Sequence, residues 1–201
     1  TGNPQVFDTA LGWRFPNPRM KALFPLEAMG ETAENLVEKY KISREAQDRF
    51  ASESHQKAIV AWEQGYFDDE VIPVEVQQRK KVVTVARDEG PRADSTLEKL
   101  STLRAVFRDG GSVTAGNSST LNDGAAALVL MARSKAESLG LEPMAKLVAT
   151  GAAGVDPRTM GIGPVAATQE ALARAGLSVG DLDLVELNEA FAAQSLAVIE
   201  E

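Results

Sequence analysis

The spacing of hydrophobic positions in the first third of the chain predicts two helices behind an irregular start. Residues 1–28 are interrupted by several prolines, so we expect an irregular segment held over a packed surface by its aromatic side chains. Apolar residues then recur at intervals of three and four, which is typical of one buried helix face: Ala33, Leu36, Val37 and Tyr40. Ser43 is suited to cap a longer helix that runs through Gln64 and ends at Gly65. Its expected buried face comprises Phe50, Ala58, Ala61 and Trp62.

Residues 71–110 predict a hairpin and a short helix. Two extended segments, 71–76 and 82–85, are separated by polar residues, and Pro73 suggests that the first strand lies at an edge. The sequence Ser-Thr-Leu-Glu at 95–98 has the pattern of a capping box, so a helix should begin there.

The second half has a different pattern, in which strands and helices alternate. Nearly continuous apolar runs at 124–131, 146–150 and 182–187 predict buried strands, although the first could also be a short helix. Helices are expected from Ser134 to Gly140, from Pro164 to Gly176 and from about Glu189. Such alternation predicts α/β layers around a central sheet, with the first half inserted outside it and boundaries near Gly110 and residue 142.

Composition narrows the possible functions. The chain has 201 residues, 44% of them hydrophobic, and a net charge of −8, which disfavours nonspecific nucleic-acid binding. It has no cysteine, which excludes disulfides and a cysteine nucleophile within it. Its one histidine, His55, is expected at or near the surface, and no residue spacing suggests a metal site. No apolar run approaches the roughly 18 residues of a membrane span, and the two ends look like the middle of a longer protein.

One polar segment lies where chemistry is common in α/β proteins. Asn188 follows the predicted strand 182–187 and precedes a predicted helix, and ligands collect at the carboxyl ends of strands. A neutral amide there can donate a hydrogen bond to a developing oxyanion, directly or through a water molecule. From spacing alone, a cap of the following helix is the better interpretation of Asn188.

Four segments together resemble the thiolase family in order and spacing. They are MGETAEN at 29–35, VTAGNSS followed by LNDGAAA within 113–127, MGIGP at 160–164 and NEAFAAQ at 188–194. The resemblance covers almost the whole chain. It implies a partial thiolase fold of the α/β class, with the loop domain at 1–110, the end of the N-terminal domain at 111–142 and the start of the C-terminal domain at 143–201.

The resemblance also implies a mechanism and a set of site residues. Thiolases cleave 3-oxoacyl-CoA with CoA, or run the reverse Claisen condensation, through a nucleophilic cysteine that here must lie outside the chain. Asn188 matches the asparagine that helps to stabilise the thioester enolate. Arg92 matches an arginine that contacts the CoA phosphates and Phe107 an aromatic beside the adenine and pantetheine, although a surface arginine and a core phenylalanine are the ordinary alternatives. Residues matching the walls of the pantetheine tunnel are Met29, Ala115, Ser119, Ala190 and Phe191, for which close packing is the alternative.

Some positions differ from the short-chain biosynthetic branch of the family. That branch has a histidine where this chain has Ala28, and a serine near the CoA where this chain has Lys99, which could add a cation near phosphate. Residues 8–21 resemble the β-ketoadipyl-CoA type of thiolase. Arg14 or Lys21 could then face a substrate carboxylate, and a surface role is an equal alternative.

The expectation is therefore an acetyl-CoA acyltransferase of fatty-acid or aromatic degradation. It would use CoA and acyl-CoA as substrates, hold no permanent cofactor or metal, and form a cytoplasmic homodimer or homotetramer with no nucleic acid and no membrane span. The main alternative is a non-catalytic thiolase-like module that binds acyl-CoA or a lipid, which the lack of cysteine favours. A carrier-protein-dependent condensing enzyme is disfavoured by the loop domain, and a structural fragment would expose unpaired sheet edges.

Overall fold

A computed structural model describes residue 13 and residues 15–201. Its helices are α1 (Pro18–Leu23), α2 (Met29–Tyr40), α3 (Arg44–Glu63), α4 (Leu97–Ser101), α5 (Arg133–Ser138), α6 (Gly163–Ala175) and α7 (Ala192–Glu200). Two 3-10 helices are η1 (Pro157–Ile162) and η2 (Val179–Asp181), and the strands are β1 (Val74–Gln78) and β2 (Lys81–Val85). No helix in this described part of the chain is long and apolar enough to cross a membrane.

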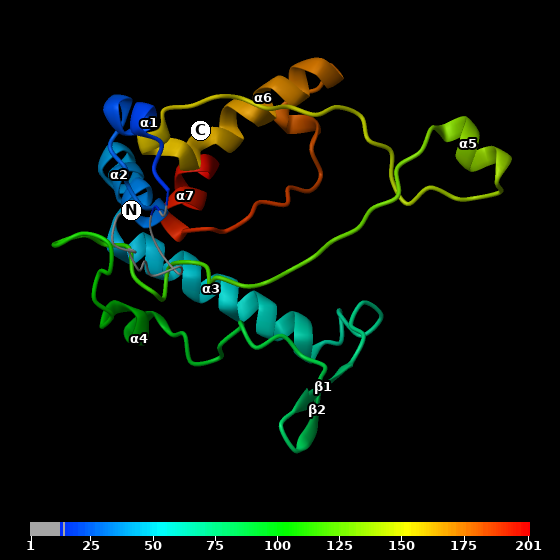
Figure 1. Ribbon diagram of the computed structural model, residues 1–201, viewed down its shortest axis with the longest axis horizontal. Helices are drawn as coiled ribbons and strands as arrows, with labels where there is room; N and C mark the ends of the chain where they lie inside the picture. The colour runs from blue at the N-terminus through cyan, green and yellow to red at the C-terminus, as the bar shows by residue number, and fades with distance from the viewer. Residues whose placement is uncertain (1–12, 14) are drawn as a thin grey trace, which may run out of the picture.

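The core forms where α2 meets α7 and η1, with α3 packed beside α7 and α4 (Figure 1). Leu36 is completely buried at its centre and packs with Ile42 and Ala197. Tyr40 and Ile162 partly cover this cluster. Segments more than 100 residues apart in sequence thus share one core, which brings the starts of α2 and α7 close to η1.

The predicted helices α2 and α3 are confirmed, but the buried face of α3 is different from the prediction. The hydroxyl oxygen of Ser43 accepts a hydrogen bond from the N–H of Ala46 at 3.1 Å and so caps α3. The buried residues of α3 include Gln47 and Asp48, whereas the four predicted apolar residues are only half-buried. The reason is that this face contacts a polar loop, residues 112–119, instead of an apolar layer.

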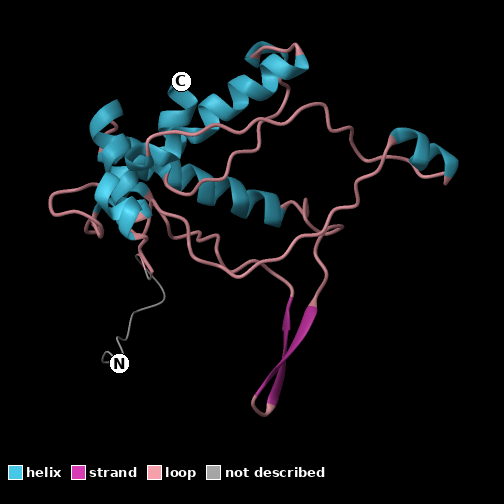
Figure 2. Ribbon diagram, turned by 45° about the horizontal axis from the view of Figure 1, so that its top comes forward, coloured by secondary structure: helices cyan, strands magenta, loops and turns pink. Residues whose placement is uncertain are grey.

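The predicted hairpin is confirmed as an antiparallel pair in which Val74 lies opposite Val85. Every residue of both strands is exposed, and Figure 2 shows the hairpin extending away from the helices. The predicted short helix forms as α4, but Thr96 caps it and not Ser95, because the Thr96 hydroxyl accepts from the N–H of Lys99 at 3.2 Å.

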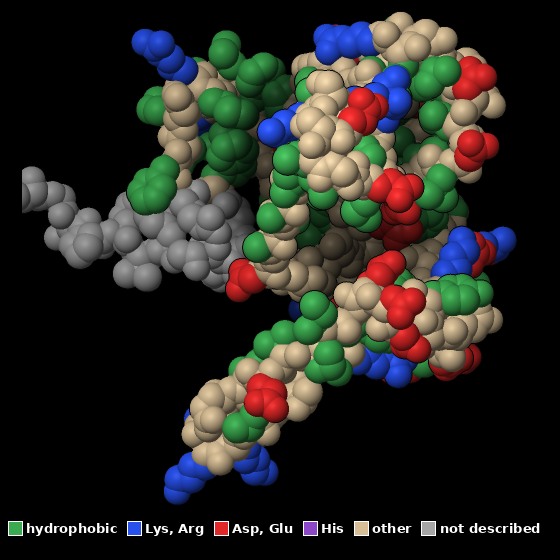
Figure 3. All heavy atoms as spheres, turned by 90° about the vertical axis from the view of Figure 1, so that its right-hand side faces the viewer, with side chains coloured by type: hydrophobic (Ala, Val, Ile, Leu, Met, Phe, Trp, Pro, Cys, Tyr) green, Lys and Arg blue, Asp and Glu red, His purple; other side chains and the backbone are tan. Residues whose placement is uncertain are grey.

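The predicted central sheet is wrong for the described residues: segments 124–131, 146–150 and 182–187 form no strands. Their apolar side chains are exposed, with Leu128 at 86% and Leu184 at 77%. A strand needs a neighbour to satisfy its backbone hydrogen bonds, and none of these three segments pairs with another described segment in a ladder. Segments 124–131 and 146–150 run instead as open connections to α5 and back, and segment 182–187 connects η2 to α7 (Figure 1). Hydrophobic side chains accordingly lie on the molecular surface around a central recess (Figure 3).

Local signals set the remaining helix ends, with three corrections. Residues 15–28 are not wholly irregular, because the Asn17 side chain caps α1 and Pro18 occupies its first turn. The helix predicted to start at Ser134 begins one residue earlier, at Arg133, and has no side-chain cap. The last helix begins at Ala192, later than the predicted Glu189. Gly176 ends α6 in the left-handed conformation, φ +69°, as a C-terminal glycine commonly does.

Candidate functional site

The loop 112–119 is held against α2 and α3 by buried polar side chains. The Glu34 carboxylate, 2% exposed, accepts hydrogen bonds from the N–H groups of Ser112 at 2.8 Å and Val113 at 2.7 Å. Asn117 accepts from the N–H of Thr114 at 2.8 Å and donates to the carboxylate of buried Asp48 at 3.0 Å. These contacts fix the loop that carries the predicted site residues Ala115 and Ser119.

The same loop pairs with the segment that enters α7. The N–H of Ser119 donates to the carbonyl of Ala190 at 2.9 Å, and the N–H of Ala192 donates to the carbonyl of Asn117 at 3.0 Å. A β-bridge joins Ser118 to Phe191 between these two bonds. Backbone pairing therefore brings together three predicted site residues that lie about 70 positions apart, namely Ser119, Ala190 and Phe191.

A pair of aromatic rings extends this cluster to the start of α2. Phe107 and Phe191 lie edge to face, with ring centroids 6.0 Å apart at an interplanar angle of 84°. Gly30 lies against the face of Phe107, and a Cβ atom there would overlap the ring. Phe107, half-buried, is thus placed beside Met29 by a close approach that only glycine allows.

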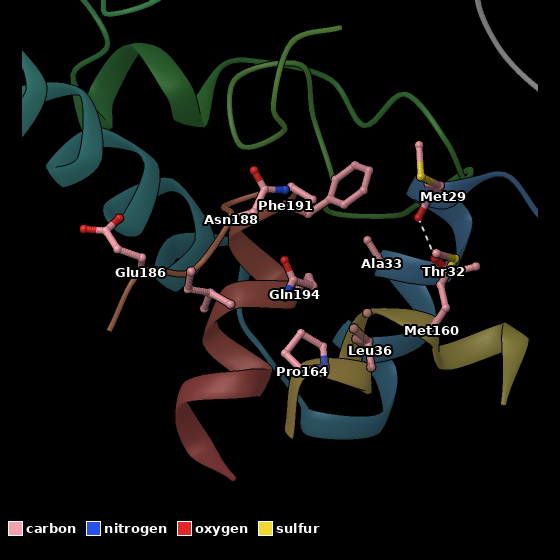
Figure 4. A pocket seen from close by; sticks show the side chains of 13 residues that line it. Met29, Thr32, Ala33, Leu36, Met160, Pro164, Glu186, Asn188, Phe191 and Gln194 are labelled. Atoms are coloured by element: carbon pink, nitrogen blue, oxygen red, sulfur yellow. Dashed lines mark hydrogen bonds between the residues drawn. The ribbon is translucent and has the colours of Figure 1, made fainter. Parts of the chain in front are cut away.

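A cavity of about 420 Å³ opens between α2, η1 and the start of α7 (Figure 4). Its walls are mostly apolar and include Met29, Leu36, Met160, Pro164 and Phe191. Thr32 also lines it, but its hydroxyl already donates to the carbonyl of Met29 at 2.7 Å. A mostly apolar wall of this kind suits an apolar part of a ligand.

Asn188 lies at the junction of two cavities and does not cap a helix. The N-cap position of α7 is Phe191, which makes no side-chain cap bond. The side chain of Asn188 makes no hydrogen bond to any described residue, and it lines both the 420 Å³ cavity and a second cavity of about 710 Å³. Its amide is therefore free to donate to a ligand, and the capping interpretation is wrong in this structure.

The second cavity is more polar. His55, Asn117, Ser119 and Glu189 are among its lining residues. The hydroxyl of Ser54 donates to the Glu189 carboxylate at 2.6 Å, which ties α3 to the segment that carries Asn188. The structure describes no group of acidic, histidine or cysteine side chains that could hold a metal ion.

Three charged side chains form an exposed cluster that follows Pro91, a residue of this cavity's wall. The guanidinium of Arg92 contacts the Asp94 carboxylate at 3.3 Å, and the ammonium of Lys99 contacts its other oxygen. Hydrogen bonds from Lys99, then from Arg92, lower the pKa of Asp94 to about 2. The cluster therefore keeps one net positive charge at neutral pH, and phosphate is the group that such a charge attracts.

His55 connects the charged cluster to the cavity wall. Its Nδ1 atom accepts a hydrogen bond from the backbone N–H of Arg92 at 3.2 Å. Burial lowers the pKa of the His55 imidazole below its usual value, and the charge of Arg92 lowers it further. The ring is therefore neutral at pH 7 and carries its proton on Nε2.

The structure gathers most of the predicted site residues and separates two. Met29, Asn188, Ala190 and Phe191 line the smaller cavity, while Phe107 and Ser119 contact Phe191 and its neighbours. Ala115 is exposed on the loop, and Arg92 lies apart, next to His55 of the larger cavity.

Sequence reasoning missed Met160 and Gln194 as wall residues of the smaller cavity, and His55 and Glu189 as wall residues of the larger one. Met160 belongs to the MGIGP segment and Gln194 closes NEAFAAQ, so their place in these motifs was the available signal.

Comparisons with known proteins identify the family. The family model of the thiolase N-terminal domain matches residues 17–134, and that of the thiolase C-terminal domain matches residues 141–201. The chain is 51% identical to the 3-oxoadipyl-CoA/3-oxo-5,6-dehydrosuberyl-CoA thiolase of Escherichia coli K12, over 98% of this chain and 49% of that protein. It is 58% identical to an acetyl-CoA acetyltransferase of Pseudomonas aeruginosa, over 85% of this chain and 44% of that protein.

A solved structure gives the same answer for the fold. The acetyl-CoA acetyltransferase of Bacillus anthracis superimposes with a TM-score of 0.84 at 54% identity, over 88% of this chain and 45% of that one. The described residues thus have a partial thiolase fold of the α/β class. The chain belongs to the thiolase family, and it spans about half the length of the curated relatives it matches.

Proposed function

We propose that this chain carries the CoA-binding side and one catalytic group of a thiolase, a CoA-dependent acyltransferase that cleaves 3-oxoacyl-CoA or runs the reverse Claisen condensation. The observation that supports this most strongly is the position of Asn188. Its amide has no described partner, and it lies where an apolar cavity meets a polar one. A CoA thioester likewise combines apolar stretches, in its acyl group and pantetheine arm, with polar groups on either side of the reacting carbonyl.

In this proposal Asn188 stabilises the negative charge that develops on the thioester oxygen, directly or through a bound water. A positioned donor of this kind contributes about 10²–10³ in rate. Met29 and Met160 form the apolar wall that keeps water from the reacting carbon. The nucleophilic thiol comes from outside this chain, because the chain has no cysteine.

The rest of the proposed site holds the CoA. Arg92 offers a planar, forked guanidinium and Lys99 a compact ammonium beside the polar cavity, and both groups suit the nucleotide phosphates. Phe107 and Phe191 offer aromatic edges, and Ala115, Ser119 and Ala190 leave room for the thin pantetheine arm. The exposure of Arg92 and Lys99, 64% and 56% of their side chains, allows both to reach a ligand.

The domain division predicted above remains a proposal. The end of the first family match at residue 134 and the start of the second at residue 141 support a boundary near residue 142. A homodimer or homotetramer, a cytoplasmic location and the absence of a permanent cofactor rest on the family alone.

The names of several relatives support a dicarboxylic acyl-CoA as substrate. The Escherichia coli relative is named for 3-oxoadipyl-CoA, which carries a second carboxylate. Of the two cations proposed to face that carboxylate, Arg14 lies outside the described residues, and Lys21 is exposed on α1. Replacing each with methionine should raise KM for the dicarboxylic substrate and leave KM for acetoacetyl-CoA unchanged; equal effects on both would contradict the proposal.

A non-catalytic acyl-CoA or lipid-binding module is the second candidate, and the lack of cysteine is the observation that favours it. Both candidates predict that the chain binds CoA. A longer polypeptide that contains this chain and a segment with a nucleophilic thiol distinguishes the two candidates. If the protein is a thiolase, this polypeptide cleaves acetoacetyl-CoA, and Asn188→Ala lowers its kcat by about 10²–10³. No turnover in that polypeptide would support the binding module.

The CoA site itself is tested by isothermal titration calorimetry of the chain with CoA. We expect saturable binding, and Arg92→Ala should weaken it about tenfold through loss of one phosphate contact. Arg87→Ala is the matched control, because Arg87 is a nearby exposed arginine whose guanidinium lies over the Trp62 ring, outside the cluster. An equal effect of the two changes would contradict the assignment of Arg92.

A further inference from the structure

Gln194 is a buried amide whose hydrogen bonds are not made within the described structure. The residue is 6% exposed, and its Oε1 atom is closed to solvent and has no partner. Leaving a buried polar group unpaired destabilises the folded state, so native proteins rarely retain one without a reason. A ligand that supplies the missing partner is one such reason.

The position of Gln194 points to a ligand in the smaller cavity. Its side chain lines that cavity from α7, and Figure 4 shows it between Asn188 on one side and Leu36 and Pro164 on the other. The neighbours of its stem are tightly packed, since a Cβ added at Gly161 would lie 2.7 Å from Gln194 Cγ. The stem is therefore held in place while the terminal amide, whose last torsion is soft, can turn toward the cavity.

Glu186 and Asn188 also line the cavity, but both are exposed, so Gln194 and Thr32 are its buried polar side chains. The hydroxyl of Thr32, the other buried polar side chain of the cavity, is already bonded to the carbonyl of Met29. A group that enters this space would therefore meet one buried amide, whose Oε1 has no described partner and which can turn toward the cavity. The complementary group is another amide, which donates an N–H to Oε1 and accepts from Nε2.

We propose that Gln194 binds an amide of the pantetheine arm of CoA. The inference rests on the proposed function, in which the acyl-CoA reaches Asn188 at the edge of the same cavity. The acyl part of a 3-oxoacyl-CoA offers only carbonyl oxygens, whereas the pantetheine arm offers amide N–H groups. An unpartnered acceptor therefore selects the arm and not the acyl group.

The proposal predicts opposite effects on binding and stability, which a merely structural glutamine would not give. Gln194→Met keeps the length of the side chain and removes the unpaired amide. We expect it to weaken CoA binding about tenfold, the value of one or two hydrogen bonds. It should leave the affinity for adenosine 3′,5′-bisphosphate, which lacks the arm, unchanged. The thermal midpoint of the unliganded chain should stay equal or rise.

Gln47→Met is the matched control. Gln47 is also buried with an unpartnered Oε1, but its Nε2 donates to the Ser112 hydroxyl at 2.9 Å, and it does not line the cavity. This change should lower the thermal midpoint and leave the ratio of CoA to bisphosphate affinity unchanged. Each variant is measured by calorimetric titration and by thermal unfolding of the full chain.

Three results would overturn the proposal: unchanged CoA affinity in Gln194→Met, equal weakening of CoA and bisphosphate, or a lower thermal midpoint. If the wild-type chain binds no CoA, the proposed function fails together with this inference. If it binds CoA and Gln194→Met binds equally well, this inference alone fails.

Discussion

Replacing Glu34 with alanine removes the acceptor that holds the loop 112–119 on α2. Two backbone N–H groups, of part-buried Ser112 and of buried Val113, lose their carboxylate partner. Hydrogen bonds to a charged group contribute about 1.5–3 kcal/mol each, which gives a gross loss of about 3–6 kcal/mol. Removing a buried carboxylate offsets part of this by relieving its desolvation. We therefore expect a net loss of about 2–4 kcal/mol in the free energy of unfolding.

Glu38→Ala is the matched control for this prediction. Glu38 lies one turn later on α2, and its exposed carboxylate pairs with Arg108 at 2.6 Å. Arg108 keeps its second contact, to the side-chain oxygen of Asn35 at 2.7 Å, when Glu38 is removed. An exposed ion pair contributes about 0–1 kcal/mol, so the control should cost no more than that.

Urea unfolding followed by far-ultraviolet circular dichroism measures both variants. The prediction is a clearly lower midpoint for Glu34→Ala than for Glu38→Ala, with similar slopes. If both variants unfold at the same urea concentration, the loop is not held by Glu34, and the argument that its hydrogen bonds position Ser119 is refuted.

Three further predictions follow from individual contacts. The Asp94 carboxylate should titrate near pH 2 by NMR. Because this pKa is depressed, the ion pairs with Lys99 and Arg92 should persist at pH 4 and be lost only as the pH falls toward 2; Lys99→Met should move the midpoint back toward 3.8. The His55 imidazole should titrate below pH 6.5, and an NMR midpoint above 6.5 would contradict its burial. Because this pKa is lowered in the folded state, the contribution of His55 to stability is present above pH 6.5 and falls at lower pH. Leu36→Ala, at a fully buried position, should cost about 2–5 kcal/mol in thermal or urea unfolding; a loss below 1 kcal/mol would mean that the core lies elsewhere.

The helices were predictable because their signals are local. Ser43 caps α3 through its own hydroxyl, and Gly176 ends α6 by adopting a positive φ, and both effects depend on a few neighbouring residues. The hairpin likewise depends on segments only a few residues apart.

The predicted central strands did not form, because a strand depends on distant partners. Segments 124–131 and 182–187 have the composition of buried strands, yet neither pairs with another described segment in a ladder. Composition alone therefore identified the tendency of these segments to form strands, but it did not show whether they form strands in this chain.

The site was predictable in part from motifs. The resemblance selected Asn188 and Phe191. The capping interpretation of Asn188, however, could be rejected only once the actual start of α7 was known. The bond from Ser54 to Glu189 joins residues 135 positions apart, and the unpaired state of Gln194 depends on everything that surrounds it. Neither property can be derived from the order of residues along the chain.

The most direct test of the proposed site is to map CoA binding residue by residue with NMR on the isotope-labelled chain. We predict that the backbone signals that shift on addition of CoA cluster at the start of α2, at the loop 112–119, at Asn188–Phe191 and around Arg92, while those of α5 remain unchanged. Shifts confined to other parts of the chain, or no shifts at saturating CoA, would contradict the proposal that these segments form the CoA site of a thiolase.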